Sequence, residues 1–142
     1  MNYAEMPAGR EMDALVAEKV MGLAPCDAWS PVNFGSAGGP AMWLDKPCGH
    51  DGKCYPTPSE HPFSGPLHYS TSIAAAWEVV ERLRADKVMG GASIAAVNAP
   101  DDATPGEWCV EWFDGDHTLD CAIGDTAPLA ICRAALAAVA RP

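Results

Sequence analysis

The sequence predicts an α+β fold in which three helices pack against a small antiparallel sheet. Three segments repeat apolar residues at the three-and-four spacing of one helical face, which is typical of amphipathic helices. One stretch near the C-terminus alternates apolar and polar residues around an Asp-Gly pair, which is typical of a β-hairpin. A chain of 142 residues, 49% of them hydrophobic, is long enough to bury one core, so we expect a single domain spanning residues 1–142.

The stretch from Tyr69 to Arg84, YSTSIAAAWEVVERLR, carries the most complete helix signature. Its apolar face collects Ile73, Ala76, Trp77, Val80 and Leu83. We therefore expect Trp77 to anchor the core. Three hydroxyl residues precede this face and can cap the N–H groups of the first turn: Ser70, Thr71 and Ser72. Gly90 and Gly91 follow and are expected to terminate the helix.

Two further helices flank this one along the chain. The segment from Glu11 to Met21 is amphipathic, and Asp13 is expected to point away from its apolar face. The last helix starts at Asp125 or Thr126 and runs through Val139. Because this helix is apolar nearly all round, it either packs at the centre of the domain or is covered by a second subunit.

The stretch EWCVEWFDGDHTLDCAI predicts a hairpin between Trp108 and Ile123 that turns at Asp114-Gly115. A two-residue turn gives three cross-strand pairs on one face: Trp112 with His117, Val110 with Leu119, and Trp108 with Cys121. In this register Cys109 and Cys121 point to opposite faces and should not form a disulfide. A third strand, buried, is expected at Ser93 to Val97. The predicted core residues are Trp77, Val110, Leu119 and Leu136.

A region rich in Cys, Pro and Gly at about residues 25–68, which we call the insert, lacks any clear period apart from a candidate strand at Ala41 to Leu44. Within it, Cys48, His50 and Cys54 are close enough in sequence to supply ligands to a zinc ion. Their spacing is not that of the common zinc knuckles, so a glycine-rich turn with reduced cysteines is the other interpretation. No other cofactor is predicted.

The charge balance argues against one broad class of partner. Nineteen acidic residues against nine basic ones give a formal net charge of -10, and no basic cluster is present to neutralise the phosphates of a duplex nucleic acid. The N-terminal sequence lacks the pattern of a signal peptide, and no apolar run is long enough to span a membrane. We therefore expect a cytoplasmic protein with no membrane contact. Its six cysteines are expected as thiols or metal ligands.

Three segments, taken in order, resemble the phage ABA sandwich domain family: EMDALVAEKVMG, YSTSIAAAWEVVERL and DTAPLAICRAALAAV. Together they make up roughly a third of the chain. The resemblance implies a three-layer α/β/α sandwich and a small phage protein that acts in the host bacterial cytoplasm. It brings no catalytic residues, and it implies nothing about the insert.

The sequence favours a ligand-binding protein over an enzyme. It shows no nucleophile with a base, no phosphate-binding glycine loop and no paired metal motif on a helix. The residues left after core assignment are aromatic rings and hydroxyls beside a helix N-terminus, where free N–H groups favour phosphate. The candidate ligand-binding residues are Tyr69, Ser70, Thr71, Ser72, Trp29 and Trp43, with Arg82 supplied by a neighbouring subunit.

By analogy with small phage proteins that counter host immunity, we expect a homo-oligomer that sequesters a nucleotide-type host immune signal, such as a cyclic nucleotide. Two alternatives remain open: an acidic interaction protein that blocks a host protein, and a zinc-stabilised phage accessory protein. A ligand at a hundred times its Kd would stabilise the fold by about 2.7 kcal/mol, whereas a protein blocker would not respond to nucleotides.

Overall fold

The computed structural model describes residues 2–26, 29–32, 41–44, 49, 53–56, 68–97 and 107–141. In these residues a short 3-10 helix, η1 (Tyr3–Glu5), precedes three α-helices: α1 (Arg10–Lys19), α2 (Ile73–Ala85) and α3 (Ala127–Val139). The strands are β1 (Ala24–Cys26), β2 (Trp29–Val32), β3 (Ala41–Leu44), β4 (Cys54–Pro56), β5 (Gly91–Val97), β6 (Glu107–Asp114) and β7 (His117–Gly124).

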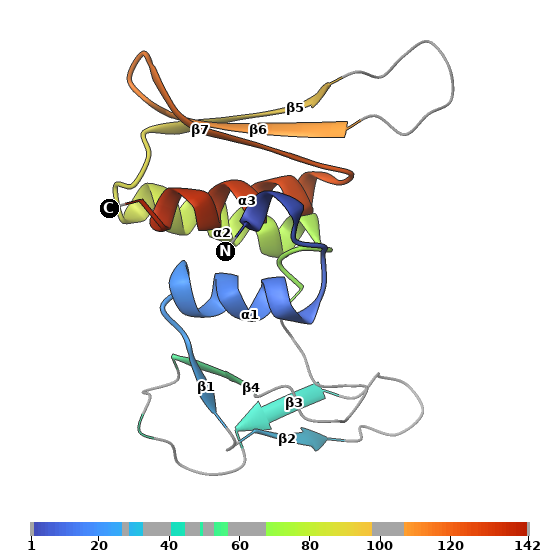
Figure 1. The fold of residues 1–142 in the computed structure, drawn as a ribbon. Helices are drawn as coiled ribbons and strands as arrows, with labels where there is room; N and C mark the ends of the chain where they lie inside the picture. Colours follow the sequence, from blue (N-terminus) through green and yellow to red (C-terminus); the bar gives the residue numbers. More distant parts are fainter. Residues whose placement is uncertain are drawn as a thin grey trace.

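One antiparallel sheet and two parallel helices form the main body of the domain. The sheet has the strand order β5-β6-β7, and α2 and α3 lie side by side beneath it, with α3 under β6 and β7 (Figure 1). Helix α1 packs on the far side of this helix pair, and the strand pairs β1-β4 and β2-β3 lie beyond α1. The predicted α+β class, with three helices and an antiparallel sheet built on the hairpin, is confirmed.

Helix α3 occupies the centre of the fold. Thr126 caps it by accepting a hydrogen bond from the Leu129 N–H at 3.4 Å, and Pro128 stands in the first turn, where its missing N–H is not needed. The buried residues of α3 are Pro128, Leu129, Ala130, Ile131, Cys132, Ala134, Ala135 and Leu136. Of the two interpretations left open by its apolar composition, central packing is the one found. Val110 and Leu136 are buried as predicted, and Leu119 packs against the same core while partly buried.

One arginine fastens distant segments to α3. Arg133 donates from Nε and Nη2 to the carbonyl of Met6, at 3.1 and 2.8 Å, and from Nη1 to the carbonyl of Ile123, at 2.8 Å. The charged residue of an otherwise apolar helix therefore holds both the N-terminal segment and the end of β7.

The prediction that Trp77 belongs to the core is wrong, because α2 turns a different face to α3. The buried residues of α2 are Ala76, Val79, Val80 and Leu83. Ile73 and Trp77 lie beside this face and remain 54% and 49% exposed. Two overlapping apolar stripes fit the sequence of this helix, and the structure buries the stripe that contains Val79.

Helix α2 ends within one residue of the predicted stretch, but not through the predicted glycine pair. It stops at Ala85, and a Schellman hydrogen bond from the Val88 N–H to the Leu83 carbonyl, at 3.0 Å, closes its C-terminus. Lys87 takes the left-handed conformation, with φ of 56°, that glycine usually supplies at this position. The Gly90-Gly91 pair therefore does not terminate the helix, and its second residue begins β5.

The hairpin forms where predicted, but the predicted register is wrong. Its turn residues are Gly115 and Asp116, and Gly115 has a left-handed φ of 61°. The turn therefore lies one residue later than predicted, and a bulge between Trp112 and Phe113 shifts the register by a further residue. The observed pairs are Trp112 with Asp120, Val110 with Ala122, and Trp108 with Gly124.

This register places Cys109 and Cys121 on the same face of the sheet, contrary to the prediction. Cys109 pairs with Ile123 and Cys121 with Glu111, so the two cysteines are diagonal neighbours, and their thiols are hydrogen-bonded. Desolvation and this hydrogen bond raise the pKa of Cys109. Both cysteines are free thiols, as expected from the sequence.

Strand β5 lies at the edge of the sheet. It covers the segment predicted as a buried strand, but it is largely exposed, because its second side has no strand partner among the described residues. Its exposed residues are Ala92, Ser93, Ala95 and Ala96, whereas Ile94 is half-buried.

Parts of the insert are described. The strand expected at Ala41 to Leu44 is β3, which pairs antiparallel with β2. Strand β4 pairs parallel with β1 and carries Tyr55, whose ring is buried in the core and whose hydroxyl donates to Glu18 of α1. Burial, followed by this hydrogen bond, raises the pKa of Tyr55 to about 12. The insert is thereby anchored to α1.

Candidate ligand-binding site

Two of the predicted ligand-binding residues hold the fold together. Tyr69 and Ser70 are buried. The Ser70 hydroxyl accepts a hydrogen bond from the Gly9 N–H at 2.9 Å, and the Ser70 N–H donates to Oδ1 of Asp13 at 2.7 Å. Asp13 is itself buried, contrary to the prediction that it points away from the apolar face. These contacts join α1 to the start of α2, so Tyr69 and Ser70 are internal.

The ionisation of two of these groups reflects their burial. Desolvation raises the pKa of Asp13, while hydrogen bonds from the backbone and side chain of Ser70 oppose this change. Desolvation and the neighbouring carboxylates of Glu78 and Asp13 raise the pKa of Tyr69 to about 12. Neither group has the exposure of a ligand contact.

The other candidates on α2 lie at its two ends. Thr71 is exposed, and Ser72 caps the helix by accepting a hydrogen bond from the Ala75 N–H at 3.4 Å. Arg82 lies near the C-terminal end, where its Nε forms an ion pair with Asp86 at 2.8 Å. Within one chain the structure therefore does not bring Arg82 to the hydroxyl cap.

The remaining candidates belong to the insert. Trp29 of β2 and Trp43 of β3 stand one position out of direct register on paired strands. Cys54 lies in β4 and is buried, whereas Cys48 and His50 lie outside the described residues. Zinc binding by these three residues stays a prediction.

A groove with two tryptophans opens between α2, the edge of the sheet and the start of α3. Its volume is about 530 Å³. The lining residues are Ile73 and Trp77 of α2, Ile94 of β5, Trp108 of β6, and Asp125, Thr126, Ala127 and Pro128 at the start of α3. Trp77 is half exposed, so its indole offers a flat apolar surface on which an aromatic ring can stack. We call this opening the tryptophan groove.

Two helix N-termini open on the tryptophan groove. Helices α2 and α3 run parallel and start at the same end of the molecule (Figure 1). Each N-terminus carries a partial charge of roughly +0.5, and the N–H groups of Ile73 and Ala74 in the first turn of α2 have no acceptor within the helix. At the start of α3, Pro128 removes one donor and Asp125 adds a carboxylate. An anionic group is therefore better placed at α2 than at α3.

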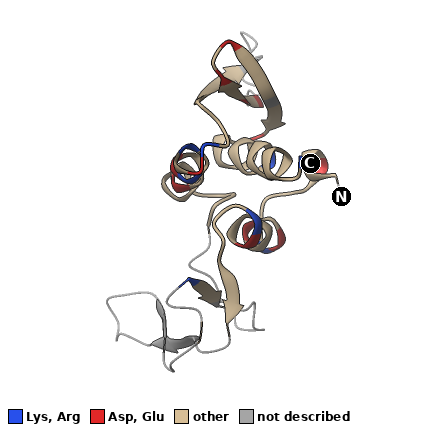
Figure 2. Ribbon diagram, turned by 90° about the vertical axis from the view of Figure 1, so that its left-hand side faces the viewer, with Lys and Arg blue, Asp and Glu red and all other residues tan. Residues whose placement is uncertain are grey.

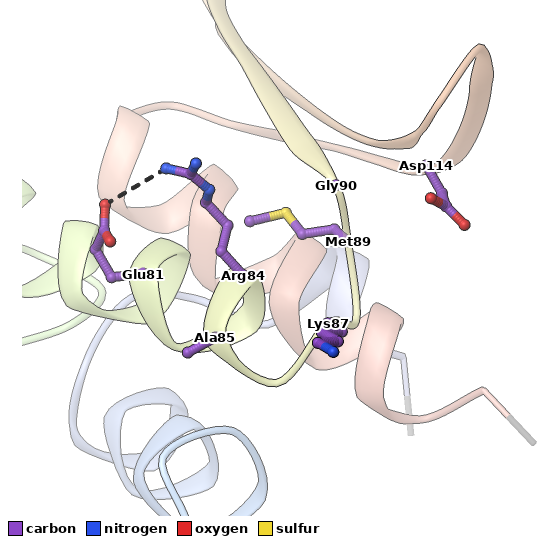
Figure 3. A pocket seen from close by; sticks show the side chains of 7 residues that line it. All are labelled: Glu81, Arg84, Ala85, Lys87, Met89, Gly90 and Asp114. Atoms are coloured by element: carbon purple, nitrogen blue, oxygen red, sulfur yellow. Dashed lines mark ion pairs between the residues drawn. The ribbon is translucent and has the colours of Figure 1, made fainter.

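A second pocket, of about 550 Å³, lies at the other end of α2 (Figure 3). Its lining residues are Glu81, Arg84, Ala85, Lys87, Met89, Gly90 and Asp114. Arg84 reaches toward Glu81, at 3.9 Å, whereas Lys87 and Asp114 point elsewhere. Because its two cations do not converge and two carboxylates accompany them, this pocket is a poorer candidate for an anionic ligand.

Sequence reasoning missed the tryptophan groove because it assigned Ile73 and Trp77 to the core. One signal could have found them: α2 has more apolar positions than a single stripe against one neighbouring helix can bury. Trp108 and Asp125 come from elements distant in the sequence, and only the tertiary structure brings them to α2.

Two further observations limit the kinds of site that the described residues offer. None of the described helices combines the length and the hydropathy needed to cross a membrane. The described residues also contain no group of three or more His, Cys, Asp or Glu side chains placed to hold a metal ion.

Comparison with known proteins identifies the family. The model of the phage ABA sandwich domain matches residues 14–136, which include α2, the three-stranded sheet and most of α1 and α3. No curated protein and no solved structure gives a significant match. The matched residues contain every element that lines the tryptophan groove. The chain therefore belongs to the phage ABA sandwich domain family.

Proposed function

We propose that this protein is a non-enzymatic phage protein that sequesters a nucleotide-type signal of host immunity, and that the ligand binds in the tryptophan groove. One observation carries the proposal: two large apolar side chains, Ile73 and Trp77, stay about half exposed beside a helix N-terminus. Apolar surface next to N–H donors is what a molecule with both a ring and a phosphate requires.

In this proposal the base stacks on Trp77 and the phosphate lies at the first turn of α2. Stacking of a base on an aromatic side chain contributes about 1–3 kcal/mol. The N–H groups of Ile73 and Ala74, together with the exposed Thr71 hydroxyl, supply hydrogen-bond donors to the phosphate. Tyr69 is buried, so Trp77 takes the role that the sequence assigned to Tyr69.

The groove suits binding without turnover. Its lining contains one carboxylate, from Asp125, and one hydroxyl, from Thr126, which already caps α3. Cleavage of a nucleotide would need an activated nucleophile or a bound metal. A protein that only holds its ligand lowers the free concentration of a signal in proportion to the protein present. The link to host immunity rests on analogy with other small phage proteins.

Thermal unfolding with a nucleotide panel tests the proposal. The panel should contain cyclic dinucleotides and signals derived from adenine dinucleotides. A bound nucleotide at a hundred times its Kd adds about 2.7 kcal/mol, which for a chain of this length raises Tm by about 10 °C. Trp77→Ala should remove the stacking contribution and weaken binding about 5-fold to 150-fold.

A matched pair of isoleucines provides the control. Ile73 in the groove is 54% exposed, and Ile123 on the outer face of the sheet is 45% exposed. Ile73→Ala should weaken nucleotide binding, whereas Ile123→Ala should not. A panel that leaves the wild-type Tm unchanged would refute the proposed ligand class, and a Trp77→Ala protein with full affinity would place the ligand elsewhere.

One observation favours a second function, an acidic interaction protein that blocks a basic host protein. Asp125 places a carboxylate in an otherwise apolar groove, on a chain of net charge -10. A lysine or arginine of a partner could contact both the carboxylate and an indole. Asp125→Asn separates the two functions. Losing one negative charge should strengthen nucleotide binding by up to about 1 kcal/mol, roughly fivefold, and should weaken the binding of a basic partner by a similar factor.

A further inference from the structure

The three-stranded sheet leaves part of the helix layer uncovered. Packed helices lie about 8–10 Å apart and neighbouring strands about 4.8 Å apart, so two adjacent helices need about four strands to cover them. Helix α3 lies under β6 and β7, and β5 forms the edge on the side of α2. Ile73 and Trp77 of α2, which line the groove together with Ile94 of β5, remain about half exposed.

Strand β5 has the properties of an unprotected edge. Its sequence, GASIAAV, contains no charged residue and no proline, and it pairs with β6 in one register throughout. Natural sheet edges are usually protected from pairing by charges, prolines or bulges. Every second residue of an edge strand turns its N–H and C=O groups outward, and no described strand occupies this side of β5. The edge can therefore accept another strand.

The segment that carries α2 and β5 is electrically neutral, although the protein is acidic. Residues 70–97 contain three acidic residues against three basic ones, which leaves a net charge of zero, compared with -10 for the whole chain. Both signs are visible on α2 in Figure 2. Two copies of the chain repel each other over most of their surface, but not through α2 and β5.

We infer that a second copy of this chain binds at this edge, with the β5 strands of the two copies paired antiparallel about a two-fold axis. The three-stranded sheets then join into one sheet of six strands. A two-fold axis fits because each copy presents the same self-complementary edge. Ala92 and Ala96 lie on the helix-facing side of β5, since they pair with Trp112 and Trp108. Their small side chains leave room for Trp77 of the second copy.

The inference goes beyond the ligand proposal and does not depend on it. Among the described residues, the outer edge of β5 has no strand partner and Ile73 and Trp77 of α2 stay exposed, whether or not a nucleotide binds. Where both proposals hold, the second copy closes the open side of the tryptophan groove, and the ligand lies enclosed between the copies.

Analytical ultracentrifugation and hydrogen exchange on the full chain test the inference. We expect a mass close to twice 14.9 kDa at micromolar concentration. We also expect the outward-facing β5 amides, which do not pair with β6, to exchange slowly in the dimer and rapidly on dilution. Ala96→Glu places a charge on the helix-facing side of the edge, where a single copy tolerates it because Ala96 is exposed. This change should raise the dimer Kd at least about 100-fold, since the charge is buried in the dimer.

Ala95→Glu is the matched control, because Ala95 is also exposed but lies on the outer face of β5. It should change the dimer Kd less than about fivefold. A monomer at every concentration would overturn the inference, as would a dimer whose outward-facing β5 amides exchange rapidly or that survives Ala96→Glu. If the protein is a monomer that still binds a nucleotide, only the dimer inference is refuted. If it is a dimer that binds no nucleotide, only the ligand proposal is refuted.

Discussion

Ser70→Ala removes one hydroxyl from the junction of α1 and α2 and should destabilise the whole fold. This hydroxyl is fully buried, accepts the Gly9 N–H at 2.9 Å and donates to the carboxyl group of Asp13. Its loss leaves the Gly9 N–H without its acceptor, at about 1 kcal/mol, and removes a hydrogen bond to a buried carboxyl group, at about 1.5–3 kcal/mol. The expected total, about 2.5–4 kcal/mol, is a large part of the roughly 5–15 kcal/mol that stabilises a domain.

Urea unfolding at one fixed protein concentration measures this loss. The Ser70→Ala midpoint should fall by about 1–2 M with an unchanged slope, because the surface exposed on unfolding stays the same. Thr71→Ala is the control, since Thr71 is the exposed neighbouring hydroxyl and its loss should change stability by less than about 0.5 kcal/mol. Equal midpoints for the two variants would refute the assignment of Ser70 as a junction residue.

The buried carboxyl group of Asp13 should make stability fall as the pH rises. Burial raises the pKa of folded Asp13 above its ordinary value of 3.8, so the stability that this group contributes is fully present below pH 3.8 and is lost as the pH rises through the folded pKa. The free energy of unfolding of Asp13→Asn, measured by urea unfolding at several pH values, should change less over this range. Lys87→Gly should raise stability by about 1 kcal/mol, because glycine adopts the left-handed φ of 56° without strain, and Lys87→Ala should show no such gain in thermal unfolding. Gly124→Ala should destabilise by about 1–3 kcal/mol, because the added Cβ would stand 2.8 Å from the backbone nitrogen of Ala130, whereas Gly91→Ala meets no atom within 4 Å and should be neutral.

The sequence predicts those elements that local chemistry decides. The hydroxyl cap before Ile73, the proline in the first turn of α3 and the turn glycine of the hairpin each have one favourable local conformation. The all-round apolar composition of α3 likewise allowed central packing to be foreseen as one of two outcomes. These signals act over a few residues and need no knowledge of the tertiary structure.

The candidate site was not predictable because it depends on how the helices and strands pack against one another. In α2 the stripes that contain Trp77 or Val79 are both apolar, and the packing against α3 buries the one with Val79. In the hairpin, a turn shifted by one residue and a bulge after Trp112 change every cross-strand partner. The polar character of Ser70 suggested a ligand contact, whereas the nearby Asp13 carboxyl group makes it an internal residue.

The contact between Arg133 and Met6 can form only late in the synthesis of the chain. These residues are 127 positions apart, so the Met6 carbonyl has no partner until the last helix has been synthesised, whereas Gly9 can bond to Ser70 earlier. At bacterial or other cellular elongation rates of about 5–20 residues per second, this interval lasts roughly 6–25 s. Helix α1 packs against α3 as well, and its apolar face stays without that cover for the same interval. A truncation within α3 therefore removes a helix against which α1 packs.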